Sequence, residues 1–113
     1  MNLDDARVVL EWMGMRVAVI NGELRWDTTD CDHSLEEEYY GEDMLDANWI
    51  MGTLVPALKT KFPQKWGINV FYGWDDAVSV YFFGVGVETL KGTGSTFEAA
   101  MISAAAKAIR GTK

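Results

Sequence analysis

The sequence predicts a single α+β domain, residues 1–113, in which helices flank a mostly antiparallel sheet. With 113 residues, of which 49% are hydrophobic and 24% charged, the chain is typical of one soluble globular domain. Helical and strand periodicities follow one another in the order α-β-β-α-β-β-α. Short turns join the strands in pairs, which indicates antiparallel hairpins with helices around them.

The first elements are a helix and a β-hairpin. Asp4 or Asp5 can cap the helix, and Gly14 ends it. Residues 15–20 and 23–27 have the character of strands. Asn21 and Gly22 lie between them, and this dipeptide is typical of a two-residue hairpin turn.

A long acidic loop is expected over residues 28–42, which are polar and follow neither periodicity. Asp43 then has the character of a helix N-cap, and residues 44–62 are predicted to form the main helix. Pro56 lies inside this helix and lacks an N–H group. We therefore expect a kink or a break near Thr53.

Two more strands are predicted at residues 68–72 and 78–83, joined by a turn. The second strand has apolar residues on both faces, which indicates a central strand that is covered on both sides. Glycines interrupt the segment after it. Ser95 or Thr96 then begins an Ala-rich helix that runs to Arg110 and stops at Gly111.

Three segments resemble the phage ABA sandwich domain family. They are Val9 to Gly14 (VLEWMG) with the following hairpin that contains Gly22 and Trp26, the acidic stretch leading into Asp46 to Ile50 (DANWI), and the Ala-rich segment Thr96 to Ala105 (TFEAAMISAA). The resemblance implies a three-layer α-β-α sandwich and an origin in phages or prophages. It implies no general activity.

Negative charge is concentrated in the first half of the chain. Residues 1–58 contain 13 carboxylates and three arginines, a net charge of −10, whereas residues 59–113 contain four carboxylates and seven basic side chains, a net charge of +3. A surface of one sign attracts cationic partners and repels nucleic acid and anionic membranes. The sequence therefore predicts a basic protein as the partner, with no direct binding to nucleic acid or membrane.

The acidic loop and nearby aromatic side chains are the first candidate site. Such a surface can imitate the phosphate array of nucleic acid, occupy the basic groove of a host defence protein and inhibit it. The alternative is a solvated loop whose charge only keeps the protein soluble. Tyrosine and tryptophan are frequent interface anchors. The candidate partner-binding residues are Asp30, Asp32, Glu36, Glu37, Glu38, Tyr39, Tyr40, Glu42 and Trp74.

The segment before the last helix is the second candidate site. Free N–H groups and hydroxyls at a helix N-terminus can hold the phosphate of a nucleotide-like small molecule or another anion. The spacing is not that of a P-loop, and a flexible, capped glycine loop is the alternative interpretation. The candidate anion-binding residues are Lys91, Gly92, Thr93, Gly94, Ser95 and Thr96.

No enzymatic activity, metal or cofactor is predicted. His33 is the sole histidine and belongs to no nucleophile motif. Residues 27–33 combine three aspartates with Cys31 and His33, but their spacing matches no known metal-binding motif. A structural role in the virion is a third class of function, and no coiled coil or repeat supports it.

The expected location is the cytoplasm of the host cell. The single cysteine fits a reducing compartment, and the acidic N-terminus is not a signal peptide. No apolar run approaches the length of a membrane helix. The 14 aromatic residues exceed what a core of this size buries, so some aromatic surface is expected at a partner or homo-oligomer contact, whereas Trp12, Trp49, Phe71 and Phe83 are expected in the core.

Overall fold

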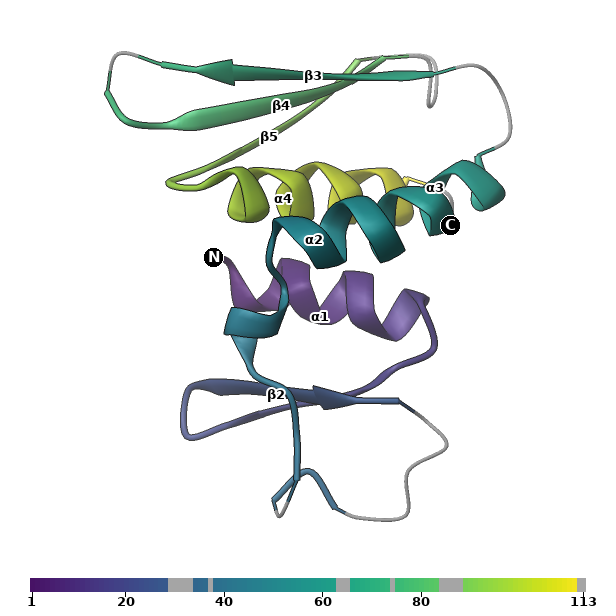
Figure 1. The fold of residues 1–113 in the computed structure, drawn as a ribbon, viewed down its shortest axis with the longest axis vertical. Coiled ribbons are helices and arrows are strands. Elements are labelled where there is room, and N and C mark those ends of the chain that lie inside the picture. Colours follow the sequence, from purple (N-terminus) through teal and green to yellow (C-terminus); the bar gives the residue numbers. More distant parts are fainter. Residues whose placement is uncertain (29–33, 37, 63–65, 74, 84–88, 112–113) are drawn as a thin grey trace.

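Helices lie between two antiparallel sheets in the computed structural model of this chain (Figure 1). The structure describes residues 1–28, 34–36, 38–62, 66–73, 75–83 and 89–111. The predicted α+β class with antiparallel pairing is confirmed. The order of the layers differs from an α-β-α sandwich: a three-stranded sheet and a two-stranded hairpin are the outer layers, and the helices separate them.

Helix α1 (Leu3–Trp12) begins earlier than predicted, before Asp4 and Asp5, the two residues that were expected to cap it. Asn2 is the N-cap, and its side chain accepts a hydrogen bond of 3.1 Å from the backbone N–H of Asp5. Asp4 and Asp5 lie in the first turn instead, where their charge stabilises the positive end of the helix dipole. Gly14 follows the helix with a φ of +86°, the left-handed conformation in which glycine is not strained.

The hairpin of β1 (Arg16–Ile20) and β2 (Glu23–Asp27) forms as predicted. Asn21 and Gly22 both have positive φ, 54° and 77°, as a type I′ turn requires. Leu24 and Trp26 are buried and belong to the core. The hairpin is therefore held to the molecule by one face, and α1 contacts β1.

The predicted main helix, residues 44–62, is present from Ala47 to Lys61 as one continuous coil that contains a π-helical segment (Figure 1). A short 3₁₀ turn, η1 (Glu42–Met44), is followed by α2 (Ala47–Trp49), the π-helical segment η2 (Ile50–Leu54) and α3 (Val55–Lys61). Asp46, not Asp43, caps α2, with a hydrogen bond of 2.8 Å from the N–H of Trp49. The π-helical segment includes Thr53, the position where the proline was expected to disturb the helix. Pro56 lacks the N–H that would donate to the carbonyl of Gly52, so the hydrogen bonds shift to a wider spacing there.

The second sheet contains β3 (Gly67–Tyr72), β4 (Val78–Phe83) and β5 (Leu90–Gly94), in the order β3-β4-β5. Strand β5 was not predicted, because its two glycines indicated a break. In the structure both glycines face α4. A Cβ atom at Gly94 would lie 2.6 Å from the Cβ of Ala99, and one at Gly92 would overlap the helix backbone at Ala100 and Ala104. Glycine is present because the strand backbone approaches the helix backbone closely.

Only one face of the second sheet is covered. Val78, Val80 and Phe82 of β4 are buried toward the helices. The opposite face carries aromatic residues, and the prediction that Phe71 and Phe83 lie in the core is wrong: their side chains are 55% and 43% exposed. The helices pack beneath this sheet, and in the described residues no second layer lies on the other side. The expectation of a central strand covered on both faces is therefore also wrong.

Helix α4 (Phe97–Arg110) is the centre of the molecule. It contacts β4 and β5 on one side and α1 on another. Its small side chains allow this close approach on several sides. The buried alanines are Ala99, Ala100, Ala104, Ala105, Ala106 and Ala108. None of the helices in the described ranges combines the length and the apolar character that crossing a bilayer requires.

Thr96, rather than Ser95, caps α4. Its hydroxyl accepts a hydrogen bond of 3.1 Å from the N–H of Ala99. We expect Thr96→Ala to lower the free energy of unfolding by about 1 kcal/mol, because this N–H group loses its partner. Denaturant unfolding measures the change. Thr96→Ser keeps the hydroxyl and should differ from wild type by less than half of that amount; an equal loss in both variants would contradict the capping role.

Candidate acidic binding site

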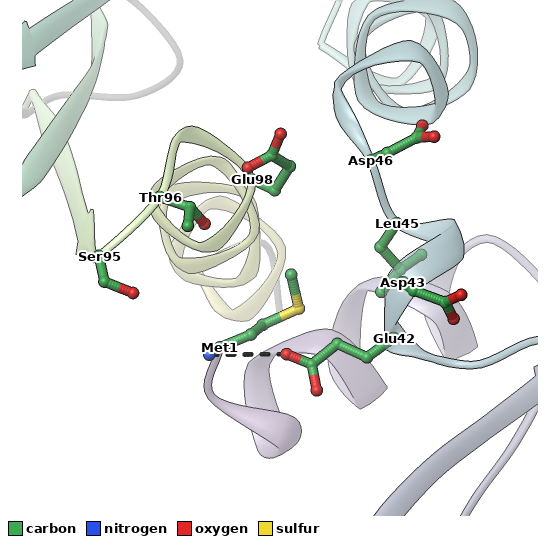
Figure 2. Close-up of a pocket in the computed structure, with 8 residues that line it drawn as sticks. All are labelled: Met1, Glu42, Asp43, Leu45, Asp46, Ser95, Thr96 and Glu98. Carbon is green, nitrogen blue, oxygen red and sulfur yellow. Dashed lines mark ion pairs between the residues drawn. The ribbon is translucent and has the colours of Figure 1, made fainter.

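A cavity of about 580 Å³ lies between the start of α4 and the η1 turn (Figure 2). Two segments that the sequence marked as separate candidates meet here: the end of the acidic stretch and the residues before the last helix. The lining residues are Met1, Glu42, Asp43, Leu45, Asp46, Ser95, Thr96 and Glu98. We call Glu42, Asp43, Asp46 and Glu98 the acidic site.

The four carboxylates of the acidic site come from three different elements. Glu42 and Asp43 begin η1 and are exposed. Asp46 is the exposed N-cap of α2, and Glu98 is half-buried in the first turn of α4. The backbone amine of Met1 lies 3.7 Å from Oε1 of Glu42 and is the one cationic group among the described lining residues. Carboxylates therefore outnumber cations in the cavity, and the local potential is negative.

This arrangement favours a cation over the anion considered above. Residues 91–94 belong to strand β5 and do not form the expected flexible loop. The Lys91 ammonium lies 5.8 Å from the ring centroid of Tyr81, and Lys91 is not among the cavity's lining residues. The Thr96 hydroxyl already accepts from the backbone of α4. A phosphate placed beside Ser95 and Thr96 would face the carboxylates of the acidic site, and like charges repel.

Tyr39 and Tyr40 are attached to the first hairpin. Tyr40 forms a β-bridge with Trp26, through hydrogen bonds of 2.8 and 3.0 Å, and its ring lies 5.1 Å from that of Trp26. The Arg25 guanidinium lies 4.3 Å from the ring centroid of Tyr39, whose hydroxyl donates to Glu23. Both rings are still 37–44% exposed. The end of the predicted loop is therefore held in place, next to the acidic site in the chain.

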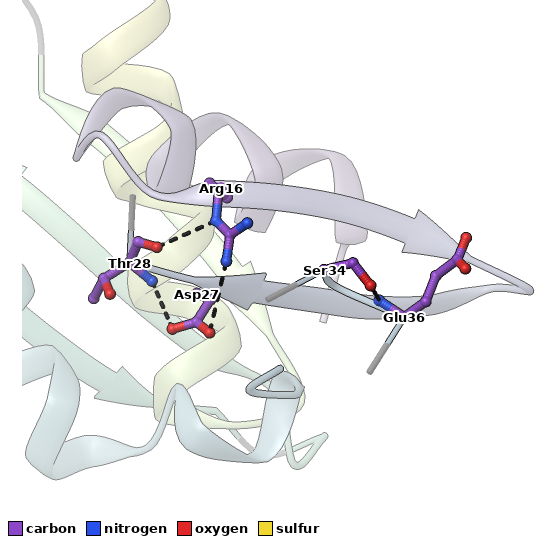
Figure 3. A network of polar contacts seen from close by, with 5 residues as sticks. All are labelled: Arg16, Asp27, Thr28, Ser34 and Glu36. Atoms are coloured by element: carbon purple, nitrogen blue, oxygen red, sulfur yellow. Dashed lines mark hydrogen bonds and ion pairs between the residues drawn. The ribbon is translucent and has the colours of Figure 1, made fainter. Parts of the chain in front are cut away.

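Asp27 is a carboxylate with a structural role (Figure 3). It is 4% exposed, and its Oδ2 lies 3.9 Å from the Arg16 guanidinium. Arg16 also donates to the carbonyl of Thr28 at 3.2 Å, and the N–H of Thr28 donates to Asp27 at 2.7 Å. Because a cation neutralises this buried charge, Asp27 adds little to the acidic surface. The contacts instead fix the point at which the chain leaves β2.

On the other side of the loop, the N–H of Glu36 donates to the Ser34 hydroxyl at 3.3 Å (Figure 3). Glu36 and Glu38 are exposed. They extend the negative surface away from the cavity. The predicted residues Asp30, Asp32, Glu37 and Trp74, and also Cys31 and His33, lie outside the described residues.

Of the lining residues outside the segment before α4, the sequence identified only Glu42 as a site residue; Met1, Asp43, Leu45, Asp46 and Glu98 were not predicted. The residues next to Glu98 in the sequence indicate that it belongs to a capping box, and those next to Leu45 indicate that it is a core residue. Only the packing of the α4 N-terminus near η1 brings them to one cavity. Within the described ranges, no group of three or more His, Cys, Asp or Glu side chains has the geometry to hold a metal ion.

Comparison with known proteins adds no further residue to this site. A scan against protein-family models and a search of the curated proteins both return no match to this chain.

Proposed function

We propose that this protein acts by binding a basic partner protein through the acidic site, without catalysing a reaction. The observation that supports this most is the cavity whose lining includes four carboxylates from segments about 50 residues apart in the sequence. In Figure 2 the carboxylates of Asp43 and Asp46 point away from α4, so the four make one negatively charged surface and do not converge on a single point. An arginine or lysine side chain that entered it would form charge-assisted hydrogen bonds, which are about twice as strong as neutral ones.

The lining suits the charged end of a cationic side chain. Leu45 and the Met1 side chain contribute little surface, because they are 1% and 6% exposed. The exposed carboxylates would therefore bind the ammonium or guanidinium group that lysine and arginine carry at the end of the side chain. The volume of about 580 Å³ is within the range of about 300–1,000 Å³ that is usual for ligand pockets, and it admits more than one such side chain.

The surface beside the cavity extends the proposed interface. Tyr39 and Tyr40 are part-exposed and already held against β2, so binding would order little additional structure. Aromatic side chains of this kind supply much of the energy of protein interfaces. Exposed Glu36 and Glu38 would steer a basic partner toward this side of the molecule.

The partner that fits is a protein whose basic groove binds nucleic acid. Closely spaced carboxylates compete for the same lysines and arginines as phosphates do, and such binding weakens steeply as salt is added. Occupying the groove would inhibit the partner. If the resemblance to phage proteins reflects common origin, the partner is a host protein, such as a defence protein, in the cytoplasm.

A pair of matched variants tests the proposal. Glu42→Gln/Asp43→Asn removes two charges from the acidic site, and Asp75→Asn/Asp76→Asn removes two from a turn in the other sheet. Both variants have the same net charge and similar shape. With short lysine- and arginine-containing peptides as probes, we expect the first variant to bind about fivefold more weakly than wild type, since two exposed ion pairs contribute about 1 kcal/mol together.

The second variant is the control and should bind the peptides within about twofold of wild type. Calorimetry at low and high salt, together with NMR chemical-shift mapping, measures affinity and location. Equal weakening by the two variants would mean that the peptides respond only to net charge, and the proposal would be wrong. The same two variants then separate specific from non-specific proteins captured from a bacterial lysate.

A further inference from the structure

Strand β3 is the edge of its sheet, and in the described residues its second side has no partner strand. The N–H of Gly73 donates to the carbonyl of Ala77 across the pair with β4, at 2.8 Å. Ladder hydrogen bonds alternate along an antiparallel strand, so the N–H and C=O groups of Ile68, Val70 and Tyr72 point to the open side. A row of such groups is a template for another strand.

The sequence of β3 does nothing to prevent such pairing. Gly67 to Tyr72 (GINVFY) contains no charged residue and no proline, two of the features that protect an edge strand from pairing. The other edges differ. β1 contains Arg16, β5 contains Lys91 and two glycines, and β2 is bridged by Tyr40.

The side chains of β3 are also incompletely covered. Helix α4 packs against β4 and β5, which leaves β3 at the margin of the helix layer. Tyr72 is 69% exposed and Phe71 is 55% exposed. Figure 1 places this strand at the opposite end of the molecule from the β1–β2 hairpin. A partner at β3 would therefore leave the acidic site accessible.

The charges at the two ends of β3 are opposite. The Lys59 ammonium lies 4.8 Å from the ring centroid of Trp66, the residue before the strand. Lys61 follows on the exposed side of α3. Exposed Asp75 and Asp76 lie in the turn that follows the other end of the strand, three and four residues after Tyr72. In an antiparallel pair of identical strands, each basic end lies beside the partner's acidic end, whereas a parallel pair brings like charges together.

We propose that two copies of this chain pair antiparallel through β3 and form one continuous six-stranded sheet. The arrangement has two-fold symmetry, in which the same surface serves both copies. In this arrangement the outer face of one copy's β3-β4-β5 sheet continues into that of the other copy. Each of these faces contains Phe71, Tyr81 and Phe83. A single strand pair buries less than the roughly 800 Å² per partner of a standard interface, so we expect micromolar association that depends on concentration.

Sedimentation of the full chain over a concentration series tests the proposal. The mass should rise from 12.6 kDa toward twice that value as the concentration passes the micromolar range. Val70→Pro removes an N–H group that points to the open edge and leaves the ladder with β4 intact, so it should abolish the rise. A constant mass of 12.6 kDa for wild type would overturn the proposal.

Thr93→Pro is the matched control, since the same alternation directs the N–H of Thr93 to the open edge of β5. This variant should dimerise like wild type. Circular dichroism and thermal unfolding verify that both proline variants are folded. If Val70→Pro is folded and still dimerises, or if Thr93→Pro abolishes the dimer, β3 is not the interface.

Charge exchange tests the orientation independently. Lys59→Glu/Lys61→Glu should weaken the dimer at least tenfold, because carboxylates then face the partner's Asp75 and Asp76. Adding Asp75→Lys to the same chain restores opposite charges only in the antiparallel arrangement, so the dimer should return. Asp76 stays unchanged because its φ of 61° is unfavourable for lysine. Failure of the third substitution to restore association would overturn the antiparallel proposal.

Discussion

Phe82→Ala should lower the free energy of unfolding by about 3–5 kcal/mol, the loss typical of removing a buried phenylalanine side chain. Phe82 is 0% exposed, faces the helix layer, and its ring lies 5.2 Å from that of Trp66. Its removal eliminates the apolar contacts of the ring and leaves a cavity that the neighbouring backbone cannot close. Denaturant unfolding followed by tryptophan fluorescence and circular dichroism measures the change.

The adjacent residue is a control of the same size and chemistry. Phe83 is on the opposite face of β4 and is 43% exposed, so Phe83→Ala should cost about 1 kcal/mol or less. The two alanine variants differ only in which face of the sheet loses a ring. If both lost the same stability, the outer face would have to be covered, and the one-sided sheet described here would be incorrect.

Gly92→Ala should cost about 3 kcal/mol, an effect at the upper end of the usual range for overpacking. The added methyl group would overlap the backbone of α4 at Ala100 and Ala104, and backbone cannot move aside as a flexible side chain can. Either β5 or α4 must shift, and the close packing of the strand on the helix is lost. For a domain of this size, the melting temperature should fall by roughly 10 °C or more.

Gly52→Ala is the matched control for Gly92→Ala. Gly52 lies in the π-helical segment, where a Cβ atom would meet no atom within 4 Å and φ is not positive. Alanine is favoured over glycine in helices, so this variant should be about 0.5–1 kcal/mol more stable than wild type. Opposite signs for the two substitutions would establish that the effect at Gly92 is steric. A neutral Gly92→Ala would contradict the close approach of β5 to α4.

Local signals in the sequence were sufficient for the elements whose ends depend on nearby residues. The turn at Asn21 and Gly22, strand β4, the start of α4 at Thr96 and the disturbance before Pro56 are all as expected. Strand β4 follows from its β-branched and aromatic residues, and each of the other features depends on φ preferences, capping or a missing N–H within a few residues. Such causes act in the same way in the unfolded chain and in the folded protein.

The features that were not predicted depend on how one element packs against another. The glycines of β5 indicated a break because the helix that requires them begins only after the strand. Phe71 and Phe83 indicated a covered face because an apolar side chain has the same sequence signature whether a second layer covers it or not. The acidic site required Glu98 and Glu42 to be brought together by the packing of α4 near η1. No local pattern contains that information.

The position of α4 also determines which parts of the molecule unfold together in local fluctuations. The two sheets share no ladder within the described residues, and α4 contacts β4 and β5 on one side and α1, which contacts β1, on another. Local fluctuations of either sheet are therefore coupled through one helix, and its amides should exchange with solvent most slowly. The acidic site includes the first turn of this helix. A ligand bound there would therefore slow the exchange of backbone amides with solvent in both sheets.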